Sequence, residues 1–315
     1  MYDRFYRALY RIRRVEEEIA AVYPSDKIKS PVHLSIGQEA VSVGVCEALH
    51  PDDVAFGTYR SHALYLAKGG NLRRMIAELY GKADGCAKGK GGSMHLIDVE
   101  ARAMGASAVV GTTIPQALGF AYALKLQRKK SIVVSFFGDG AVDEGVFHES
   151  MNFAALKSLP VLFICENNFY AIHTHISKRQ KLDNICERAR SYGIAAERIP
   201  NNDVLRIYER ASEAVAMIRS GNGGPVFLEC TTYRLKEHVG PNDDFDLGYR
   251  KREEAQEWIA ADPLRRLAGS IDPERRAKVE GEIEAEIRDA FAFAEQSPFP
   301  VAAELYSDVF DPKVI

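Results

Sequence analysis

The stretch that decides the fold is Ser131-Ile-Val-Val-Ser-Phe-Phe137, which runs directly into Gly138-Asp139-Gly140. A continuous run of β-branched and aromatic residues is typical of a strand that is buried on both faces of a parallel sheet. Similar runs follow at Val161–Cys165 and Val226–Cys230, and helical patterns over about 143–158 and 203–219 separate them. Strands that alternate with helices predict an α/β fold, a parallel sheet with helices on both faces.

The ends of the first two predicted strands carry groups that suit a metal ion and a phosphate. Asp139 follows the first strand and Asn168 follows the second, and the span from Gly138 to Asn168 is 31 residues. This length fits a strand–helix–strand crossover, whose two strands end at the edge of the sheet where open α/β folds bind ligands. A carboxylate and an amide carbonyl suit Mg²⁺ when phosphate oxygens complete its coordination. The glycines beside Asp139 and the amino end of the next helix both favour a bound diphosphate.

The composition is that of an ordinary globular protein, with 46% hydrophobic and 27% charged residues among 315. A net charge of −3 argues against a strongly basic nucleic-acid-binding surface. No apolar run reaches the roughly 18 residues of a membrane-spanning helix, and the segment after Met1 does not resemble a secretory signal. The five cysteines are scattered without a Cys-x-x-Cys pair, which favours reduced thiols. We therefore expect a cytoplasmic protein with no nucleic-acid or membrane partner.

We expect a single domain over residues 1–315, because no stretch has the composition of a linker. A helical N-terminal extension is predicted over 1–30, where Tyr2, Phe5, Leu9, Ile12, Val15, Ile19 and Val22 recur at helical spacing. A charged, helical C-terminal extension is predicted over 243–315. Residues 81–95 contain five glycines and are expected to form a long functional loop. Further helices are predicted at 37–49, 71–80, 252–260 and 272–295.

Four further stretches carry recognisable motifs. They are His33-Leu-Ser-Ile-Gly-Gln-Glu-Ala40, Tyr59-Arg-Ser-His62, Gly89-Lys-Gly-Gly-Ser-Met-His95 and Ile164-Cys-Glu-Asn-Asn-Phe-Tyr170. With Gly138-Asp139-Gly140 and Asn167-Asn168, which are similar to the thiamine-diphosphate-binding signature, they resemble the alpha subunit of the decarboxylating component of 2-oxoacid dehydrogenases. This family includes pyruvate, branched-chain 2-oxoacid and acetoin dehydrogenases. The resemblance runs from about His33 to Leu264 and implies the thiamine-diphosphate-binding fold.

The resemblance also implies a role for each matched residue. Magnesium would be bound by Asp139, by the Asn168 side chain and by the backbone carbonyl of Tyr170. The diphosphate would be held by Tyr59, by Arg60, whose fork matches phosphate geometry, and by the backbone amides of Gly140 and Ala141. Val110 would present its backbone to the aminopyrimidine ring of the cofactor. Arg234 and His238, which follow the third strand, would face the cofactor.

Three histidines in matched motifs are the candidate catalytic residues. His33 and His62 would line the active site by this resemblance. His238 is the strongest candidate for proton transfer, because the intrinsic pKa of histidine lies near neutrality. Of the other histidines, His173 and His175 are two residues apart, which leaves a metal site as an alternative.

The resemblance implies that this chain supplies only half of an active site. In the family, the catalytic glutamate and much of the pyrimidine pocket come from a separate beta subunit. We therefore expect two alpha and two beta chains, with the cofactor between them and a lipoyl acyltransferase as a possible further partner. The expected reaction decarboxylates a 2-oxo acid and passes the acyl unit to a lipoyl carrier.

The acceptor of the acyl unit stays open at this point. The loop Lys236-Glu-His-Val239 differs from the family pattern at the mouth of the lipoyl channel, and Ala108 replaces a usual glycine. The alternative function is a thiamine-diphosphate-dependent carboligase that transfers the acyl unit to an aldehyde, a ketone or a sugar. The sequence does not identify the 2-oxo acid.

Overall fold

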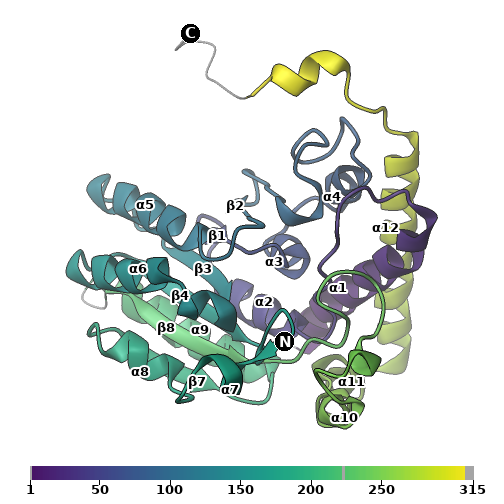
Figure 1. Cartoon of the computed structure of the whole chain (residues 1–315). Coiled ribbons are helices and arrows are strands. Elements are labelled where there is room, and N and C mark those ends of the chain that lie inside the picture. The colour runs from purple at the N-terminus through teal and green to yellow at the C-terminus, as the bar shows by residue number, and fades with distance from the viewer. Residues whose placement is uncertain (1, 222–223, 309–315) are drawn as a thin grey trace.

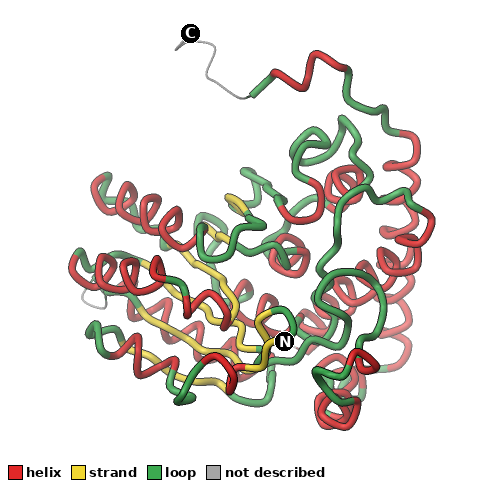
Figure 2. Tube along the Cα trace, in the orientation of Figure 1, coloured by secondary structure: helices red, strands yellow, loops and turns green. Residues whose placement is uncertain are grey.

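The centre of the molecule is a six-stranded parallel sheet with the strand order β2-β1-β3-β4-β8-β7 (Figure 1, Figure 2). The computed structural model describes residues 2–221 and 224–308. The strands are β1 (Val54–Phe56), β2 (Ala103–Gly105), β3 (Val133–Gly138), β4 (Val161–Asn167), β7 (Ala195–Ile199) and β8 (Val226–Thr231). A small antiparallel hairpin follows β4 and consists of β5 (Tyr170–Ala171) and β6 (Thr174–His175).

Helices cover both faces of the sheet, as predicted. One face packs against α2 (Glu39–Cys46) and α9 (Val204–Arg219), and the other against α5 (Thr113–Leu126), α6 (Gly145–Leu156) and α8 (Ile185–Arg190). Alternate residues of β3 pack into the hydrophobic cores on the two faces of the sheet. Val134 and Phe136 belong to the core on the α2 and α9 side, and Val133 and Phe137 belong to the core on the other side. This two-sided burial explains why the strand is a continuous apolar run.

The N-terminal and C-terminal regions are helical and lie side by side. The long helix α1 (Tyr2–Val22) packs against α12 (Pro273–Gln296), which also contacts α4 (Leu72–Leu79) (Figure 1). The apolar stripe of α1 is buried from Phe5 to Ile19, whereas Tyr2 at its start is exposed. Hydrophobic burial therefore holds this helix more than its surface ion pairs to α12. The chain reaches α12 through α10 (Arg252–Ala260) and α11 (Pro263–Ala268). The assignment of all 315 residues to one domain stays a prediction, and residues 1, 222–223 and 309–315 lie outside the described part.

The predicted strands and helices are present in the structure, with bounds that differ by a few residues. Asn71 caps the helix α4, because its side chain accepts a hydrogen bond from the backbone N–H of Arg74 at 3.1 Å. The helix predicted over 37–49 is shorter, since α2 begins only at Glu39. Further elements were not predicted from sequence patterns: β1, β2, β7, α3 (His62–Ala67), α5, α7 (Ile176–Arg179) and α8. Within the described ranges, no helix has the length and apolar character needed to cross a membrane.

Gly37 marks the point where the 33–40 segment crosses the 233–238 segment. Its φ of +96° is in the left-handed region, and a Cβ there would lie 2.4 Å from the carbonyl oxygen of Tyr233. Beside it, the backbone N–H of Leu235 donates to the carbonyl of Ile36 at 3.0 Å. The crossing brings His33 against His238, with 5.2 Å between the ring centroids.

The glycine-rich loop folds around a carboxylate of the protein itself. Glu78 is fully buried, and its carboxylate accepts hydrogen bonds of 2.7–3.0 Å from four backbone N–H groups of the loop. The donors are Ala87, Gly89, Gly91 and Gly92. A loop that could have wrapped around a phosphate therefore directs these amides at Glu78.

Candidate active site

A cavity of about 250 Å³ lies at the carboxyl ends of β3 and β4. Its lining combines strand ends with loops from distant parts of the sequence. Among the predicted site residues it includes Tyr59, Arg60, Val110, Asp139, Gly140, Ala141, Asn168, Tyr170 and His238. The structure therefore brings the residues predicted for diphosphate, metal and pyrimidine contacts to one place. His33, His62 and Arg234 are not part of this lining.

Asp139 is the carboxylate at the end of β3. The side chain is 1% exposed and forms an ion pair with Arg179 of α7, which also pairs with Asp143. Burial raises the pKa of Asp139 to about 6, although the Arg179 charge opposes this shift. A carboxylate this deeply buried requires a cation nearby, and either a guanidinium or a metal ion meets that requirement.

Asn168 follows β4 and faces the same cavity. Its side-chain Nδ2 donates to Oε1 of Gln38 at 2.8 Å, and its Oδ1 accepts the backbone N–H of Tyr170 at 3.1 Å. These two contacts fix the amide with its oxygen toward the β5 turn. The register pairs Gly138 with Glu166 across β3 and β4, which places Asp139 and Asn168 at one edge of the sheet, as predicted.

Arg60 is held at the cavity wall by two backbone carbonyls. Its guanidinium donates to the carbonyl of Leu34 at 2.7 Å and to the carbonyl of His238 at 3.1 Å. Burial lowers the pKa of Arg60 to about 10, which leaves the side chain a cation at neutral pH. With its other donor positions, the guanidinium suits an anionic group in the cavity.

Three aromatic rings cluster beside Arg60. The ring centroid of His33 lies 4.5 Å from that of Tyr59 and 5.2 Å from that of His238. Burial, and then the charge of Arg60, lower the pKa of both histidines to about 3. The predicted reason for choosing His238, a pKa near neutrality, therefore does not hold in the folded protein. The imidazoles of His33 and His238 are neutral at neutral pH. In that form each ring can both donate and accept a hydrogen bond.

Arg234 supports the cavity from behind. The side chain is 2% exposed, donates to the carbonyl of Ile172 at 3.4 Å and to the hydroxyl of Tyr249 at 2.9 Å, and pairs with Asp244 at 3.2 Å. Ile172 lines the cavity, whereas Arg234 lies one layer further in. Asp244 is thus a buried partner of Arg234. The resemblance implied that Arg234 faces the cofactor, but the structure places it behind the cavity lining.

His62 also lies outside the cavity lining. It is fully buried at the start of α3, with Nδ1 2.9 Å from Oε2 of Glu16 and Nε2 2.8 Å from Oγ of Ser93. The sequence suggested an active-site lining role because His62 belongs to the same motif as Tyr59 and Arg60. The first turn of α3 instead directs its ring into the protein, where both nitrogens have partners.

Three residues around this cavity were not among the predicted site residues. Gln38 holds the Asn168 amide, Glu166 lines the cavity at the end of β4, and Arg179 pairs with Asp139. Burial raises the pKa of Glu166 to about 7, against the charge of Arg60. The position of Glu166 directly at a strand end was a usable signal. For Arg179, nothing in the sequence indicated a contact with Asp139.

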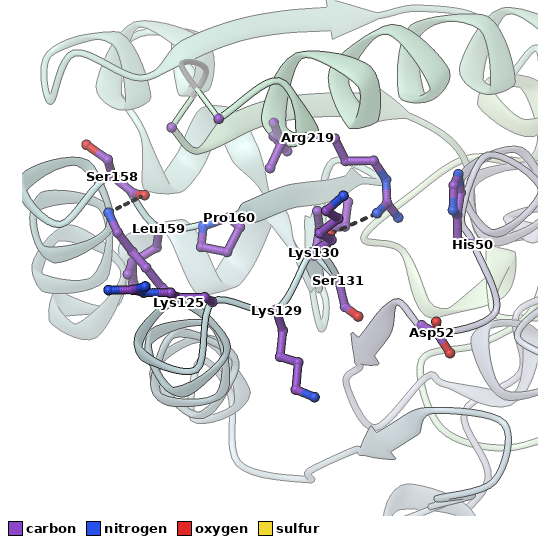
Figure 3. A pocket seen from close by; sticks show the side chains of 15 residues that line it. His50, Asp52, Lys125, Lys129, Lys130, Ser131, Ser158, Leu159, Pro160 and Arg219 are labelled. Atoms are coloured by element: carbon purple, nitrogen blue, oxygen red, sulfur yellow. Dashed lines mark hydrogen bonds between the residues drawn. The ribbon is translucent and has the colours of Figure 1, made fainter.

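A larger cavity of about 610 Å³ lies at the opposite end of the strands (Figure 3). Its cations serve the backbone: Lys125 donates to the carbonyl of Ser158 at 3.1 Å, and Arg219 donates to the carbonyl of Lys130 at 2.9 Å. Cations at helix carboxyl ends offset unpaired carbonyls and the helix dipole. This cavity contains none of the predicted site residues.

The metal alternative at His173 and His175 finds no support. The His173 ring packs on Tyr249 with 4.5 Å between centroids, and His175 Nδ1 lies 2.9 Å from the hydroxyl of Ser177. In the part of the chain that the structure describes, no group of three or more His, Cys, Asp or Glu side chains could hold a metal ion. A magnesium site of one carboxylate, one amide and one backbone carbonyl is a different ligand set.

Comparison with known proteins decides the family. The sequence model of the family described as "Dehydrogenase E1 component" matches residues 7–303. The chain belongs to the dehydrogenase E1 component family. The predicted resemblance to the alpha subunit of a thiamine-diphosphate-dependent 2-oxoacid dehydrogenase is thereby confirmed, and thiamine diphosphate is the cofactor of the family.

Curated relatives of this E1 component cover nearly its whole length. The alpha subunit of an acetoin:2,6-dichlorophenolindophenol oxidoreductase from Bacillus subtilis is 37% identical over 97% of this chain and 92% of its own length. The E1 component alpha subunit of pyruvate dehydrogenase from Zymomonas mobilis is 37% identical over 97% and 87%. The Rickettsia felis subunit of the same name is 33% identical over 98% and 95%. These relatives are named alpha subunits, which implies a beta subunit as the partner.

Proposed function

We propose that this chain, together with a beta subunit, binds thiamine diphosphate through Mg²⁺, decarboxylates a 2-oxo acid and passes the acyl unit to a lipoyl carrier. The observation that carries the proposal is the meeting of Asp139, Asn168, Arg60 and His238 in one cavity. The bound cofactor supplies the carbanion chemistry. The comparisons do not favour the carboligase alternative, and no feature of the cavity supports it.

The residues of the cavity fit this cofactor and its metal. Asp139 and the Asn168 amide offer oxygen donors at adjacent strand ends, which suits Mg²⁺ with phosphate oxygens as its other ligands. The backbone carbonyl of Tyr170 is the proposed third protein ligand. The ion pair between Arg179 and Asp139 supports this assignment, because the buried carboxylate already has a cationic partner.

The chain's other residues bind and orient the cofactor. Arg60 and Tyr59 hold the diphosphate, with the backbone amides of Gly140 and Ala141. Val110 contacts the pyrimidine through its backbone. His238, neutral at the pH of the cell, holds or passes a proton at a ring nitrogen near the reacting carbonyl. His33, which lies outside the cavity lining, packs against His238 with 5.2 Å between the ring centroids and positions it. For Arg234 and His62 we propose supporting roles, since neither lines the cavity.

The beta subunit completes the site in this proposal, in an assembly of two alpha and two beta chains. Exposed apolar side chains that line the cavity support a covering partner: Val109 is 62% exposed, Ile172 is 56% exposed and Val110 is 43% exposed. The substrate is a 2-oxo acid of a size that the two subunits define together. A lipoyl acyltransferase is the proposed acceptor, and acylation of a lipoyl domain beside reduction of an artificial dye tests it. We also propose a cytoplasmic location, in keeping with five free cysteines.

The decisive experiment replaces the proposed metal ligand. Asp139→Ala should weaken Mg²⁺-dependent binding of thiamine diphosphate by about 100-fold or more, because it removes the only carboxylate from the ligand set. Titration calorimetry on the complex with the beta subunit measures the dissociation constant. The matched control is Asp143→Ala, since Asp143 also pairs with Arg179 but is not part of the cavity lining.

The control should leave the affinity within a few-fold of the wild-type value. Equal affinities for Asp139→Ala and the wild type would exclude Asp139 as a magnesium ligand.

A further inference from the structure

Glu16 is a fully buried carboxylate that no part of the proposed function uses. It lies on α1, and its two oxygens have different partners. Oε1 accepts the backbone N–H of Ser35 at 2.8 Å, and Oε2 lies 2.9 Å from Nδ1 of His62. A buried carboxylate destabilises the folded state unless hydrogen bonds satisfy it, so the fold depends on both of these contacts.

These contacts close a ring through Arg60. The peptide group between Leu34 and Ser35 is shared: its N–H donates to Glu16, and its carbonyl accepts the Arg60 guanidinium at 2.7 Å. His62, the second partner of Glu16, follows Arg60 by two residues in the same turn. The ring therefore runs from the Arg60 side chain through the peptide to Glu16, on to His62, and back along the backbone to Arg60.

The ring fixes Arg60 from both of its ends. Glu16 sets the position of the carbonyl that receives the guanidinium and, through His62, the position of the backbone that carries it. A carboxylate at one end of a peptide dipole and a guanidinium at the other also polarise the peptide favourably. The negative charge of Glu16 helps to keep Arg60 protonated despite its burial.

Glu16, His62 and Ser93 have the residue types and contacts of a nucleophilic triad, but not its access. Each of the three side chains is 0% exposed, and the Ser93 hydroxyl meets His62 Nε2 inside the protein. No substrate reaches Ser93, so the set cannot act as a nucleophile and its base. Ser93 instead extends the ring into the glycine-rich loop.

We propose that Glu16 is a positioning residue for diphosphate recognition, and that it acts through Arg60. This inference rests on the proposed function, in which Arg60 holds the cofactor's diphosphate. It predicts that Glu16 matters for affinity only while Arg60 is present. A carboxylate that only stabilised the fold would not show this dependence.

A double-mutant cycle on the alpha–beta complex tests the inference. Thiamine diphosphate is titrated at saturating Mg²⁺ into the wild type, Glu16→Ala, Arg60→Ala and the double variant. We expect Glu16→Ala to weaken binding about tenfold or more beside Arg60 and less than about twofold in the Arg60→Ala background. Equal weakening in both backgrounds overturns the inference. No loss of affinity on Arg60→Ala instead refutes the proposed role of Arg60, which is a separate failure.

Two matched variants separate positioning from stability. Asp53→Ala removes another fully buried carboxylate, which accepts the N–H of Ile132 at 2.9 Å at the opposite end of the sheet. It should lower Tm without changing the affinity for thiamine diphosphate. Glu16→Gln keeps an oxygen for Ser35 and an amide for His62, so it should restore most of the affinity that Glu16→Ala loses.

If Glu16→Ala yields no folded complex, His62→Gln is used in the same cycle. An effect of His62→Gln that does not depend on Arg60 also overturns the inference.

Discussion

At the scale of single residues, the two histidines beside Arg60 give the site a measurable pH dependence. Burial and the Arg60 charge lower the pKa of His33 and His238 from 6.5 to about 3. Below pH 6.5 the unfolded chain takes up protons that the folded chain does not, so stability is complete above that pH and falls as the pH drops toward 3. Asp139 and Glu166, with a raised pKa, act in the opposite direction over part of this range.

Comparison with a variant isolates the histidines. Between about pH 7 and about pH 5, the Tm of the double variant His33→Gln/His238→Gln should fall less than that of the wild type. The reason is that the variant lacks the two histidines that take up protons in the unfolded chain. Differential scanning calorimetry at several pH values measures the difference. Parallel pH dependence of the two proteins would show that these pKa values are not lowered by folding.

Residue identities at the site followed from the sequence where a strand end or a motif placed them. Asp139 and Asn168 could be predicted because a parallel crossover brings two strand ends to one edge. Arg179 could not, since its contact with Asp139 depends on how the β5–β6 hairpin returns α7 to the cavity. The directions of His62 and Arg234 were equally inaccessible, because motif membership says nothing about which way a side chain points.

At the scale of elements, Glu78 of α4 accepts hydrogen bonds from four backbone N–H groups of the glycine-rich loop. Glu78→Gln should lower the free energy of unfolding by about 2–3 kcal/mol, because charge-assisted hydrogen bonds to four amides weaken together. It should also speed hydrogen exchange of the N–H groups of Gly89 and Gly91, which now donate to Glu78. Denaturant unfolding and exchange measured by NMR test the two expectations.

The control is Glu295→Gln on α12, whose carboxylate forms an exposed ion pair with Lys27. It should change the free energy of unfolding by less than about 1 kcal/mol. An equally small effect of Glu78→Gln would mean that the loop does not depend on this carboxylate.

Three long helices could be predicted from their sequence patterns, whereas the 14-residue helix α5 and the two shortest strands of the sheet could not. The helices α1, α9 and α12 repeat apolar or capping signals over several turns, so their patterns were sufficient. The strands β1 and β2 have three residues each, too few to show any periodicity. These short segments form strands because they pair with neighbouring strands of the sheet. A local sequence pattern does not reveal such pairing.

At the scale of the whole molecule, the apolar rim of the cavity predicts where the partner subunit docks. Val109→Glu should weaken association with the beta subunit at least tenfold while leaving the fold intact, since a charge would be buried without a partner. The isolated wild-type chain should release no CO₂ from 2-oxo acids. Analytical ultracentrifugation of the mixed subunits measures the association.

Leu126→Glu provides the matched control, because Leu126 is 68% exposed at the far end of α5 from the cavity. This variant should associate normally. If Val109→Glu also associates normally, the rim is not the docking surface.

The crossing at Gly37 has a consequence for how the protein is made. The Arg60 guanidinium rests on the carbonyl of His238, a residue that the ribosome adds 178 positions later. Until His238 has been synthesised, Arg60 lacks one of its two carbonyl partners. The segment from His33 to Ala40 also lacks the 233–238 segment that it crosses in the folded protein. N-terminal parts of a chain begin to fold during synthesis, but this cavity cannot be completed then. Cofactor capture is therefore a late, largely post-translational event, and the growing polypeptide emerges with its future cofactor site still open.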